Sequence, residues 1–273
     1  YAYNKQVDTL PLFGGDGVSK EDFDKLIAEE LGVKESDIYG KDLYLYNRAA
    51  GTVWGAKEEF ISSPHLDDLQ CAFATLKGFL KGYHQKSVNV YVCFDNEEVG
   101  SGTKQGAGST FLYDVLHRIN AGLGKTEEDY YRAVAGSFMI SADNAHAVHP
   151  NHPEKTDVEN CVYMNEGIVV KSHAGQKYTS DAVSIAVFRS ICERAGVPVQ
   201  FFANRSDEAG GSTLGNISST KVSLNAVDIG LPQLAMHSAY ETGGMKDTEY
   251  MVKALEVFFN SHLSVESGKI ICA

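Results

Sequence analysis

The chain has 273 residues, of which 43% are hydrophobic, and its formal net charge is −12. This composition allows one large domain, or one large and one small domain, with a substantial core, and it argues against disorder. The negative charge argues against a nucleic-acid partner or an anionic membrane surface, because both need a basic patch. No apolar stretch approaches the roughly 20 residues of a membrane span.

The cysteines and the first residues favour a cytoplasmic protein. The five cysteines are scattered along the chain and form no CxxC pair. That distribution is typical of reduced, buried thiols in a cytosolic protein. The segment 1–5 contains no apolar core of the kind that signal peptides carry. We therefore expect the protein to lie in the cytoplasm.

The first sixty or so residues predict a small mixed region. Leu10–Phe13 and Asp42–Tyr46 favour short strands. Between them, Ser19 is a helix cap with Asp22 three positions later, and Gly32 stops the helix. The expected apolar face of this helix consists of Phe23, Leu26, Ile27 and Leu31. So small a mixture is not expected to fold alone.

From Phe60 onward, predicted helices and strands alternate. The expected strands are residues 88–94, 137–142, 168–171, 199–203, 222–227 and 234–236. The expected helices are one that opens at Ser63-Pro64, residues 108–119, residues 180–196, residues 212–219 and a final helix. The first of these helices presents Leu66, Leu69, Phe73 and Leu76 on one face, and the last presents Met251, Leu255, Phe258 and Phe259. This alternation predicts an α/β fold with a mainly parallel sheet flanked by helices.

Acidic and histidine side chains stand at the ends of several predicted elements. Glu97-Glu98 follows the strand 88–94, Asp143 follows the strand 137–142, and His237 follows the strand 234–236. Asp67 lies in the first turn of the helix after Pro64. Ligands of an open parallel sheet bind beyond the carboxyl ends of its strands, so we expect these side chains to converge.

Each of these groups also has an explanation without a metal. Glu97-Glu98 fits a solvated acidic turn, Asp143 a polar loop, and His237 a satisfied residue at a strand end. Asp67 fits a helix start, where the dipole favours a carboxylate. Coincidence of all four is improbable, however. Together they form the ligand set of a two-metal hydrolase, with one carboxylate spare for proton transfer.

Longer motifs containing these residues occur in an order that matches a known family. They are residues 60–69, 95–101, 106–109, 141–151, 210–215 and 231–238. In these motifs, and over nearly its whole length, the chain resembles the aspartyl aminopeptidase family of zinc metallopeptidases. The resemblance implies a two-zinc exopeptidase-like fold. It also implies an aminopeptidase that releases acidic N-terminal residues, Asp or Glu, from peptides.

The residue roles of that family transfer to the matching positions. Asp67 resembles the carboxylate that bridges the two metals, and Glu97 resembles the general base that takes a proton from the attacking water. Glu98, Asp143 and His237 resemble the terminal metal ligands. The resemblance implies two divalent metal ions as cofactors, zinc first, with manganese or cobalt as alternatives.

Selectivity for acidic residues requires a cation in the substrate pocket. Lys177 and Arg205 are candidates, and a solvated surface position is the alternative for both. Gly211, Ser212 and Thr213 lie at a predicted helix start and offer backbone N–H groups to a substrate. Simple capping of that helix is an equally good explanation for these three residues.

Two departures from the family accompany the resemblance. His65 stands where the family usually has Arg before Leu-Asp-Asp, and the family's His-Thr-Asp-Ser-Pro motif, whose histidine is a metal ligand, has no match. Residues 1–59 resemble the tail of the family's inserted oligomerisation and substrate-gating domain. Residues 60–273 resemble its catalytic domain without the N-terminal strands. We expect His146 and His149 to lie near the ligands, or to face the oligomer, without binding metal.

The resemblance also implies peptide substrates and a large homo-oligomer, with no nucleic-acid or membrane partner. Three alternatives remain: a neutral-residue aminopeptidase, a related two-metal amidohydrolase, and a catalytically silent scaffold that lacks one metal ligand. Faster turnover of N-terminal Leu than of N-terminal Asp or Glu would favour the first two. The retained Glu97-Glu98, Asp143 and His237 argue against the scaffold, and the missing histidine argues for it.

Overall fold

The computed structural model describes residues 3–208, 210–266 and 269–272. The chain divides into two compact units, Tyr1–Tyr46 and Asn47–Ala273. Residues 47–59, expected to belong with the N-terminal region, lie in the larger unit, where β1 (Thr52–Trp54) pairs antiparallel with β2 (Phe60–Ser63). The assignment of the two regions to an inserted and a catalytic domain stays a prediction.

The smaller unit is built around one α-helix, α1 (Lys20–Leu31). Its start and end are as predicted. Ser19 and Asp22 form a reciprocal capping box, and Gly32 ends the helix in the left-handed conformation with φ of 66°. A short 3-10 helix, η1 (Glu35–Asp37), follows.

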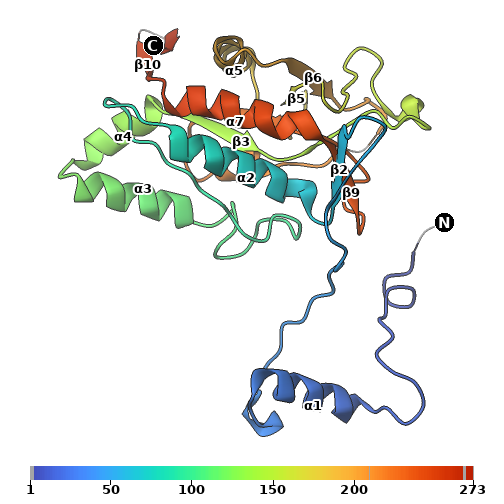
Figure 1. Ribbon diagram of the computed structural model, residues 1–273. Coiled ribbons are helices and arrows are strands. Elements are labelled where there is room, and N and C mark those ends of the chain that lie inside the picture. Colours follow the sequence, from blue (N-terminus) through green and yellow to red (C-terminus); the bar gives the residue numbers. More distant parts are fainter. Residues whose placement is uncertain (1–2, 209, 267–268, 273) are drawn as a thin grey trace. The chain divides into compact units, whose positions relative to one another are not determined.

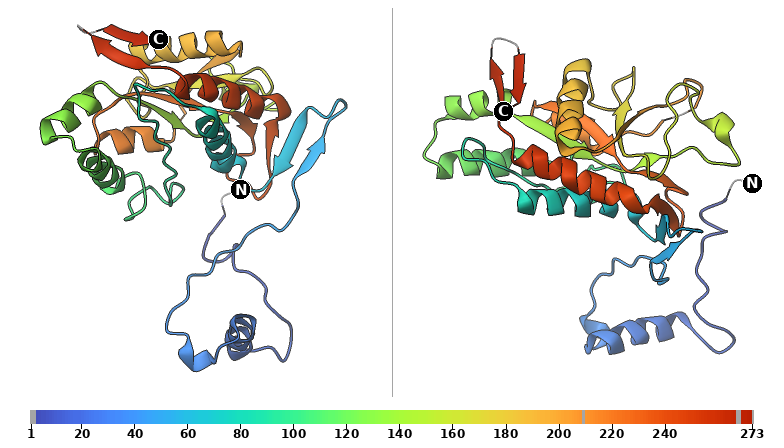
Figure 2. Two further views of the ribbon diagram at one scale, coloured as in Figure 1. Left: turned by 60° about the vertical axis from the view of Figure 1, so that its left-hand side comes forward. Right: turned by 45° about the horizontal axis from the view of Figure 1, so that its top comes forward.

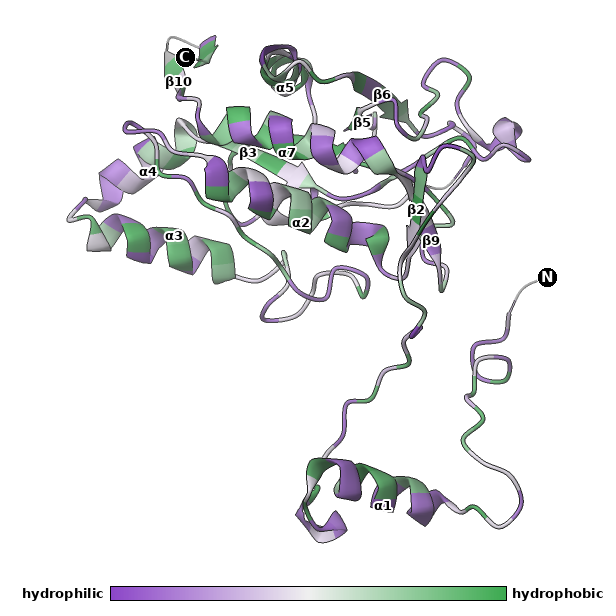
Figure 3. Ribbon diagram, in the orientation of Figure 1, coloured by the Kyte–Doolittle hydropathy of each residue, from purple (hydrophilic) through white to green (hydrophobic). Residues whose placement is uncertain are grey.

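The described residues of the smaller unit bury almost no side chain. Figure 3 shows apolar and polar residues alternating around α1, yet Ala28 is the only buried residue among residues 3–46. The strands expected at Leu10–Phe13 and Asp42–Tyr46 are absent from the described part of this unit. A strand needs a neighbour to satisfy its backbone groups, and neither segment has one here.

A four-stranded sheet forms the centre of the larger unit (Figure 1). In spatial order its strands are β3 (Phe138–Ala142), β7 (Asn225–Gly230), β5 (Ile168–Ser172) and β6 (Val199–Ala203). β3 runs parallel to β7 and β5 runs parallel to β6, whereas β5 and β7 are antiparallel. The α/β class and the mainly parallel sheet are confirmed, and the antiparallel pairing at the middle of the sheet is an addition.

Alternate residues of these strands face different surroundings. Ile168 and Val170 of β5, with Val227 and Ile229 of β7, are fully buried in the main hydrophobic core. Each such side chain contributes about 1.5–3 kcal/mol by leaving water. The core is completed by three helices, α2 (Leu66–Lys81), α5 (Ala182–Ala195) and α7 (Met245–Phe259). Figures 1 and 2 show α2 and α7 side by side over the sheet.

Two strand residues next to these core positions are polar and yet buried. Lys171 of β5 and Asp228 of β7 are buried with 3% and 0% of their surface exposed. On this side the short helix α6 (Leu214–Ser219) contacts β3 and β7, and Thr213 at its start donates a hydrogen bond to Asp228. Helices therefore contact both faces of the sheet, as the alternating pattern predicts.

A second, five-stranded sheet was not expected from the sequence. Its spatial order is β1, β2, β9 (Glu241–Gly244), β8 (Pro232–Leu234) and β4 (Ala145–His146). All of its pairings are antiparallel except that of β4 with β8. Two of its strands lead directly into predicted site residues, because α2 begins just after β2 and His237 follows β8.

The remaining elements lie around these two sheets. They are α3 (Phe111–Gly122), α4 (Glu127–Ala135), η2 (Pro153–Lys155) and a hairpin of β10 (Leu263–Glu266) with β11 (Lys269–Cys272). None of the described helices combines the length and the apolar character that crossing a membrane would need. The predicted strand 222–227 is observed three residues later, as β7, and the predicted helix 108–119 begins at Phe111.

The prediction of a buried strand at residues 88–94 is wrong. The structure has no strand there, and no backbone N–H or C=O of these described residues bonds to another backbone group. The segment is held by side chains instead. Tyr91 donates a hydrogen bond to the carbonyl of Ala72 in α2, and Asn89 donates one to the carbonyl of Phe259 in α7. A β-prone composition forms a strand only where a partner strand is available.

The predicted apolar face of α2 is confirmed only at Leu66, which is buried, and is wrong at Leu69, Phe73 and Leu76, which are exposed. Leu69 and Phe73 are 61% and 52% exposed, while Cys71 and Ala74 on the other side are fully buried. α2 packs closely along α7, where a methyl group added to Gly78 would lie 2.6 Å from Cβ of Leu255. A close helix contact of this kind admits only small side chains. Leu69 and Phe73 therefore lie on the other side of the helix.

Candidate metal centre

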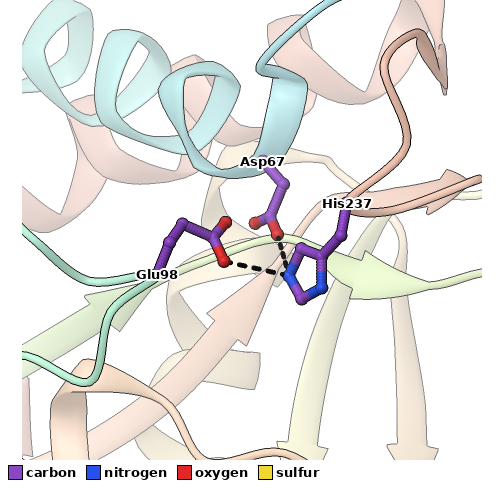
Figure 4. A group of neighbouring side chains, drawn as sticks. All are labelled: Asp67, Glu98 and His237. Atoms are coloured by element: carbon purple, nitrogen blue, oxygen red, sulfur yellow. Dashed lines mark ion pairs between the residues drawn. The ribbon is translucent and has the colours of Figure 1, made fainter. Parts of the chain in front are cut away.

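Three side chains from distant segments converge in the larger unit. Asp67 lies at the start of α2, Glu98 in the loop after residue 94, and His237 beyond β8. One ligand atom from each lies within 4.8 Å of the others. Nε2 of His237 is 3.2 Å from Oδ2 of Asp67 and 3.2 Å from Oε2 of Glu98 (Figure 4). The Asp67 side chain is 5% exposed and that of His237 is 63% exposed, so the cluster has a buried wall and an open side.

Several residues around this cluster have backbone conformations that residues other than glycine seldom adopt. His65, Asn96 and His237 have positive φ angles of 57°, 60° and 63°. A non-glycine residue in the left-handed region costs on the order of 1–3 kcal/mol, and such conformations persist only where the surroundings hold them. These residues flank or form the cluster. These backbone conformations therefore lower the local stability of the larger unit and fix the directions of the side chains in the cluster.

Burial and mutual repulsion raise the pKa values of three carboxyl groups at the site. Burial raises the pKa of Asp67 well above its usual range, and the charges of Asp143 and Glu98 raise it further. Burial, with Asp143 and Glu98, raises the pKa of Asp68 to about 6. The same causes raise the pKa of Glu97 to about 7. A single site that gathers this much negative charge is unfavourable unless a cation compensates it.

The residues present fit a divalent metal ion. Oδ1 of Asp67 is buried and has no hydrogen-bond partner within the described part of the chain. A cation among the carboxylates would give this oxygen a partner and neutralise the repulsion. Carboxylate oxygen and imidazole nitrogen are donors that zinc accepts. The geometry offers Asp67, Glu98 and His237 as ligands.

Asp143 lies beside this cluster and forms a buried ion pair. It directly follows β3 and is 3.0 Å, through Oδ2, from Nζ of Lys171. Burial alone would lower the pKa of Lys171, but Asp143, Tyr178 and Asp228 together raise the pKa above its usual value. Lys171 is therefore a cation at the site. Sequence reasoning overlooked Lys171, although a lysine that directly follows three apolar residues in the strand Ile168–Ser172 was a usable signal.

Three of the other predicted site residues, Lys177, Ser212 and Thr213, make hydrogen bonds to other groups of the chain. Nζ of Lys177 donates a hydrogen bond to the carbonyl of Gly210. Ser212 bonds to Asn216, and Thr213 uses its hydroxyl on Asp228. Gly211 is exposed. Substrate roles for Lys177, Gly211, Ser212 and Thr213 stay predictions, as do the metal and base roles of Asp67, Glu97, Glu98, Asp143 and His237.

Carboxylates and an imidazole gathered beside an α/β sheet, with one side open, are an arrangement in which a divalent metal ion can bind. Comparison with known families agrees. The chain belongs to the M18 family, because the signature described as "Aminopeptidase I zinc metalloprotease (M18)" matches residues 10–259. This confirms the resemblance to the zinc aminopeptidases.

Relatives and solved structures of the same family match most of the chain. It is 50% identical over 260 residues to the "Probable M18 family aminopeptidase 2" of Clostridium novyi, covering 94% of this chain and 60% of that protein. It is 35% identical to the "Aspartyl aminopeptidase 4" of Saccharomyces cerevisiae, covering 90% of this chain and 53% of the yeast protein. Among solved structures, the mApe1 dodecamer of the same yeast superimposes with a TM-score of 0.74 at 28% identity, covering 88% of this chain and 54% of that chain. The chain thus spans little more than half of the length of these proteins.

Proposed function

We propose that the protein containing this chain is a metal-dependent aminopeptidase that releases acidic N-terminal residues from peptides. The convergence of Asp67, Glu98 and His237 within 4.8 Å carries the proposal. Membership of a zinc metalloprotease family supports it. Two divalent ions, zinc first, are proposed as cofactors, with manganese or cobalt as alternatives. When bound, such ions supply an acidified water and polarise the scissile carbonyl.

Each residue of the proposed site is given a separate role. Asp67 is proposed to bridge the metals, with Glu98, Asp143 and His237 as terminal ligands. Glu97 is proposed as the base that accepts a proton from the attacking water. Glu97 and Glu98 are neighbours in the loop that follows residue 94, so adjacent side chains of one loop serve the water and the metal separately.

Acid selectivity is proposed to depend on Lys171 in addition to the candidate Lys177. Lys171 is the only buried lysine or arginine among the described residues, and it lies beside the proposed ligand Asp143. Its Nζ has three donors, and one of them bonds to Asp143. An acidic side chain bound near the metals would find a desolvated positive charge there. A desolvated charge interacts far more strongly than a solvated one.

The selectivity test compares Lys171→Met with Lys177→Met in the full-length protein, using N-terminal Glu and the nearly isosteric N-terminal Gln as substrates. Loss of the Glu preference in Lys171→Met alone would assign selectivity to Lys171. Loss in Lys177→Met alone would assign selectivity to Lys177. An unchanged preference in both variants would contradict the proposal for these two residues.

The activity test measures hydrolysis of N-terminal Asp, Glu and Leu chromogenic amides by the full-length protein with zinc, manganese or cobalt. Glu97→Gln is expected to lower kcat by about 10²–10⁴-fold, because a positioned base contributes that much, while bound metal is retained. Faster cleavage of the Leu amide would identify a neutral aminopeptidase. No cleavage with any metal would favour a catalytically silent scaffold.

A large homo-oligomer in the cytoplasm is also proposed. The similar mApe1 structure is a dodecamer. The described part of the smaller unit buries only Ala28, so a second copy that covers it would supply the missing core. All five cysteines are free, which suits a reducing compartment. Native mass measurement and cell fractionation of the full-length protein test these two proposals.

A further inference from the structure

A buried glutamate connects two of the proposed metal ligands through their backbones. Glu241, the first residue of β9, is 2% exposed. Its Oε2 accepts a hydrogen bond from the backbone N–H of Asp67 at 2.9 Å, and its Oε1 accepts one from the backbone N–H of His237 at 2.7 Å. The two donor residues are 170 positions apart in the sequence. One carboxylate therefore fixes two segments that arrive at the site from opposite parts of the chain.

The sheet around Glu241 gives this arrangement its geometry. β9 lies between β2 and β8 in the five-stranded sheet. β2 pairs with it up to the register Ser63↔Glu241 and then leads into Asp67, while β8 pairs with it on the other side and leads into His237. Glu241 thus stands at the end of the central strand, where its two neighbours leave the sheet to become ligand segments.

The chemistry of this position requires a carboxylate. Both partners of Glu241 are N–H donors, and a carboxylate offers two acceptor oxygens. The charge itself is buried, which is unfavourable unless it is hydrogen-bonded. Hydrogen bonds to an ionised acceptor are roughly twice as strong as neutral ones. An amide at this position would present an NH₂ group to one of the two N–H donors, so that connection would be lost.

We propose that Glu241 is a positioning residue, which fixes the backbones of Asp67 and His237 relative to each other and thereby preserves the metal-binding geometry. This rests on the proposed function only in that the two residues bind metal. Glu241 itself is not a member of the ligand cluster. It acts through the backbone, where His237 holds its left-handed φ of 63°. Loosening that backbone changes where the imidazole points.

A second buried carboxylate provides a matched control. Asp247, near the start of α7, is 0% exposed and accepts hydrogen bonds from the backbone N–H groups of Asn165 at 2.6 Å and of Gly167 at 3.1 Å. This is the same chemistry as that of Glu241, applied to a loop that carries none of the proposed ligands. Removal of either charge should weaken folding. Only the removal of the Glu241 charge should alter metal binding.

The experiment uses the full-length protein with Glu241→Gln, Glu241→Asp and Asp247→Asn. Zinc affinity is measured by competition with a chelator, and the site is monitored by the visible absorption of the cobalt-substituted protein. Glu241→Gln is expected to lower zinc affinity by about 10–100-fold, the usual effect of losing a partner outside the ligand set, and to change the cobalt spectrum. Asp247→Asn is expected to lower the melting temperature while affinity and spectrum stay at wild-type values.

Wild-type zinc affinity with an unchanged cobalt spectrum in Glu241→Gln would overturn the inference. Equal losses of affinity in Glu241→Gln and Asp247→Asn would also overturn it, because the role would then be general stability. If Glu241→Gln does not fold, the zinc affinity and cobalt spectrum of Glu241→Asp test the inference instead. The shorter side chain keeps the charge but reaches only one of the two N–H groups. If the wild-type protein binds zinc but cleaves no peptide, the proposed function fails while the affinity comparison still decides the role of Glu241.

Discussion

The two sheets of the larger unit are built by different rules. The four-stranded sheet is held by apolar packing, with strand residues such as Val170 and Ile229 fully buried against Phe188 of α5. The five-stranded sheet contributes few buried apolar side chains and many polar contacts. Among these, the hydroxyl of Ser62 bonds to Thr242 across β2 and β9, and Glu241 bonds to the segments beyond the strands. The four-stranded sheet supplies stability, and the five-stranded sheet places Asp67 and His237, two of the proposed ligands.

This difference separates two requirements that often conflict. A packed apolar core tolerates little change in volume, but it does not specify the position of a polar group. Directional hydrogen bonds to buried carboxylates specify position, at a cost in desolvation. Asp143 and its partner Lys171 lie where the sheets meet, because Asp143 directly follows β3 and β4 begins two residues after it. Substitutions in the two sheets should therefore have distinguishable effects.

The largest effect is expected from a substitution that disrupts the apolar core of the four-stranded sheet. Phe188→Ala removes a fully buried ring from the core, so we expect the free energy of unfolding to fall by about 3–5 kcal/mol. Zinc affinity of the folded protein should not change. Urea denaturation measures the free energy of unfolding, and zinc titration measures the affinity. The control variant Lys81→Ala removes an exposed ion pair with Glu256. It should lower the free energy of unfolding by less than about 1 kcal/mol. Loss of zinc binding in folded Phe188→Ala would show that the two sheets are not independent.

A smaller effect is expected where the two sheets meet. Lys171→Met leaves the Asp143 carboxylate buried without its partner. Breaking a buried pair costs about 3–5 kcal/mol, and we expect the lower end because Asp143 can protonate. In the double variant Lys171→Met/Asp143→Asn no charge is left unpaired, so much of the stability should return. Thermal unfolding of the chelated protein measures both, and a double variant less stable than Lys171→Met would contradict the ion-pair explanation.

The smallest expected effect is a pH dependence confined to the polar site. The pKa of Asp68 is raised from 3.8 to about 6, and that of Glu97 from 4.5 to about 7. Between about pH 4 and 7 the folded, metal-free protein thus binds more protons than the unfolded chain, so its stability should fall as the pH rises. Saturating zinc should flatten this slope, because a cation favours the ionised carboxylates. A melting temperature of the chelated protein that rises with pH over this range would contradict the burial of these groups.

Local signals in the sequence predicted much of the fold. The capping box of Ser19 and Asp22 and the stop at Gly32 are observed as expected, and β6 begins and ends where the pattern indicates. These features depend on residues close in the chain. The strand expected at residues 88–94 failed because strand formation needs a neighbour that the pattern does not report. The apolar face of α2 was wrong because close packing on α7 selects the small side chains instead.

The sequence by itself determined the α/β class, the family and the residues that could bind a metal, because residue types and their order in motifs carry that information. The sequence also predicted that Asp67, Glu98 and His237 would converge. Only the tertiary structure decided that their ligand atoms lie within 4.8 Å of one another, that Lys171 pairs with Asp143, and that Glu241 joins two ligand segments. These contacts connect residues far apart in the chain. Their distances depend on how the strands pair, and the contacts of Glu241 depend on a five-stranded sheet that no local pattern indicated. The sequence alone could therefore not predict these distances.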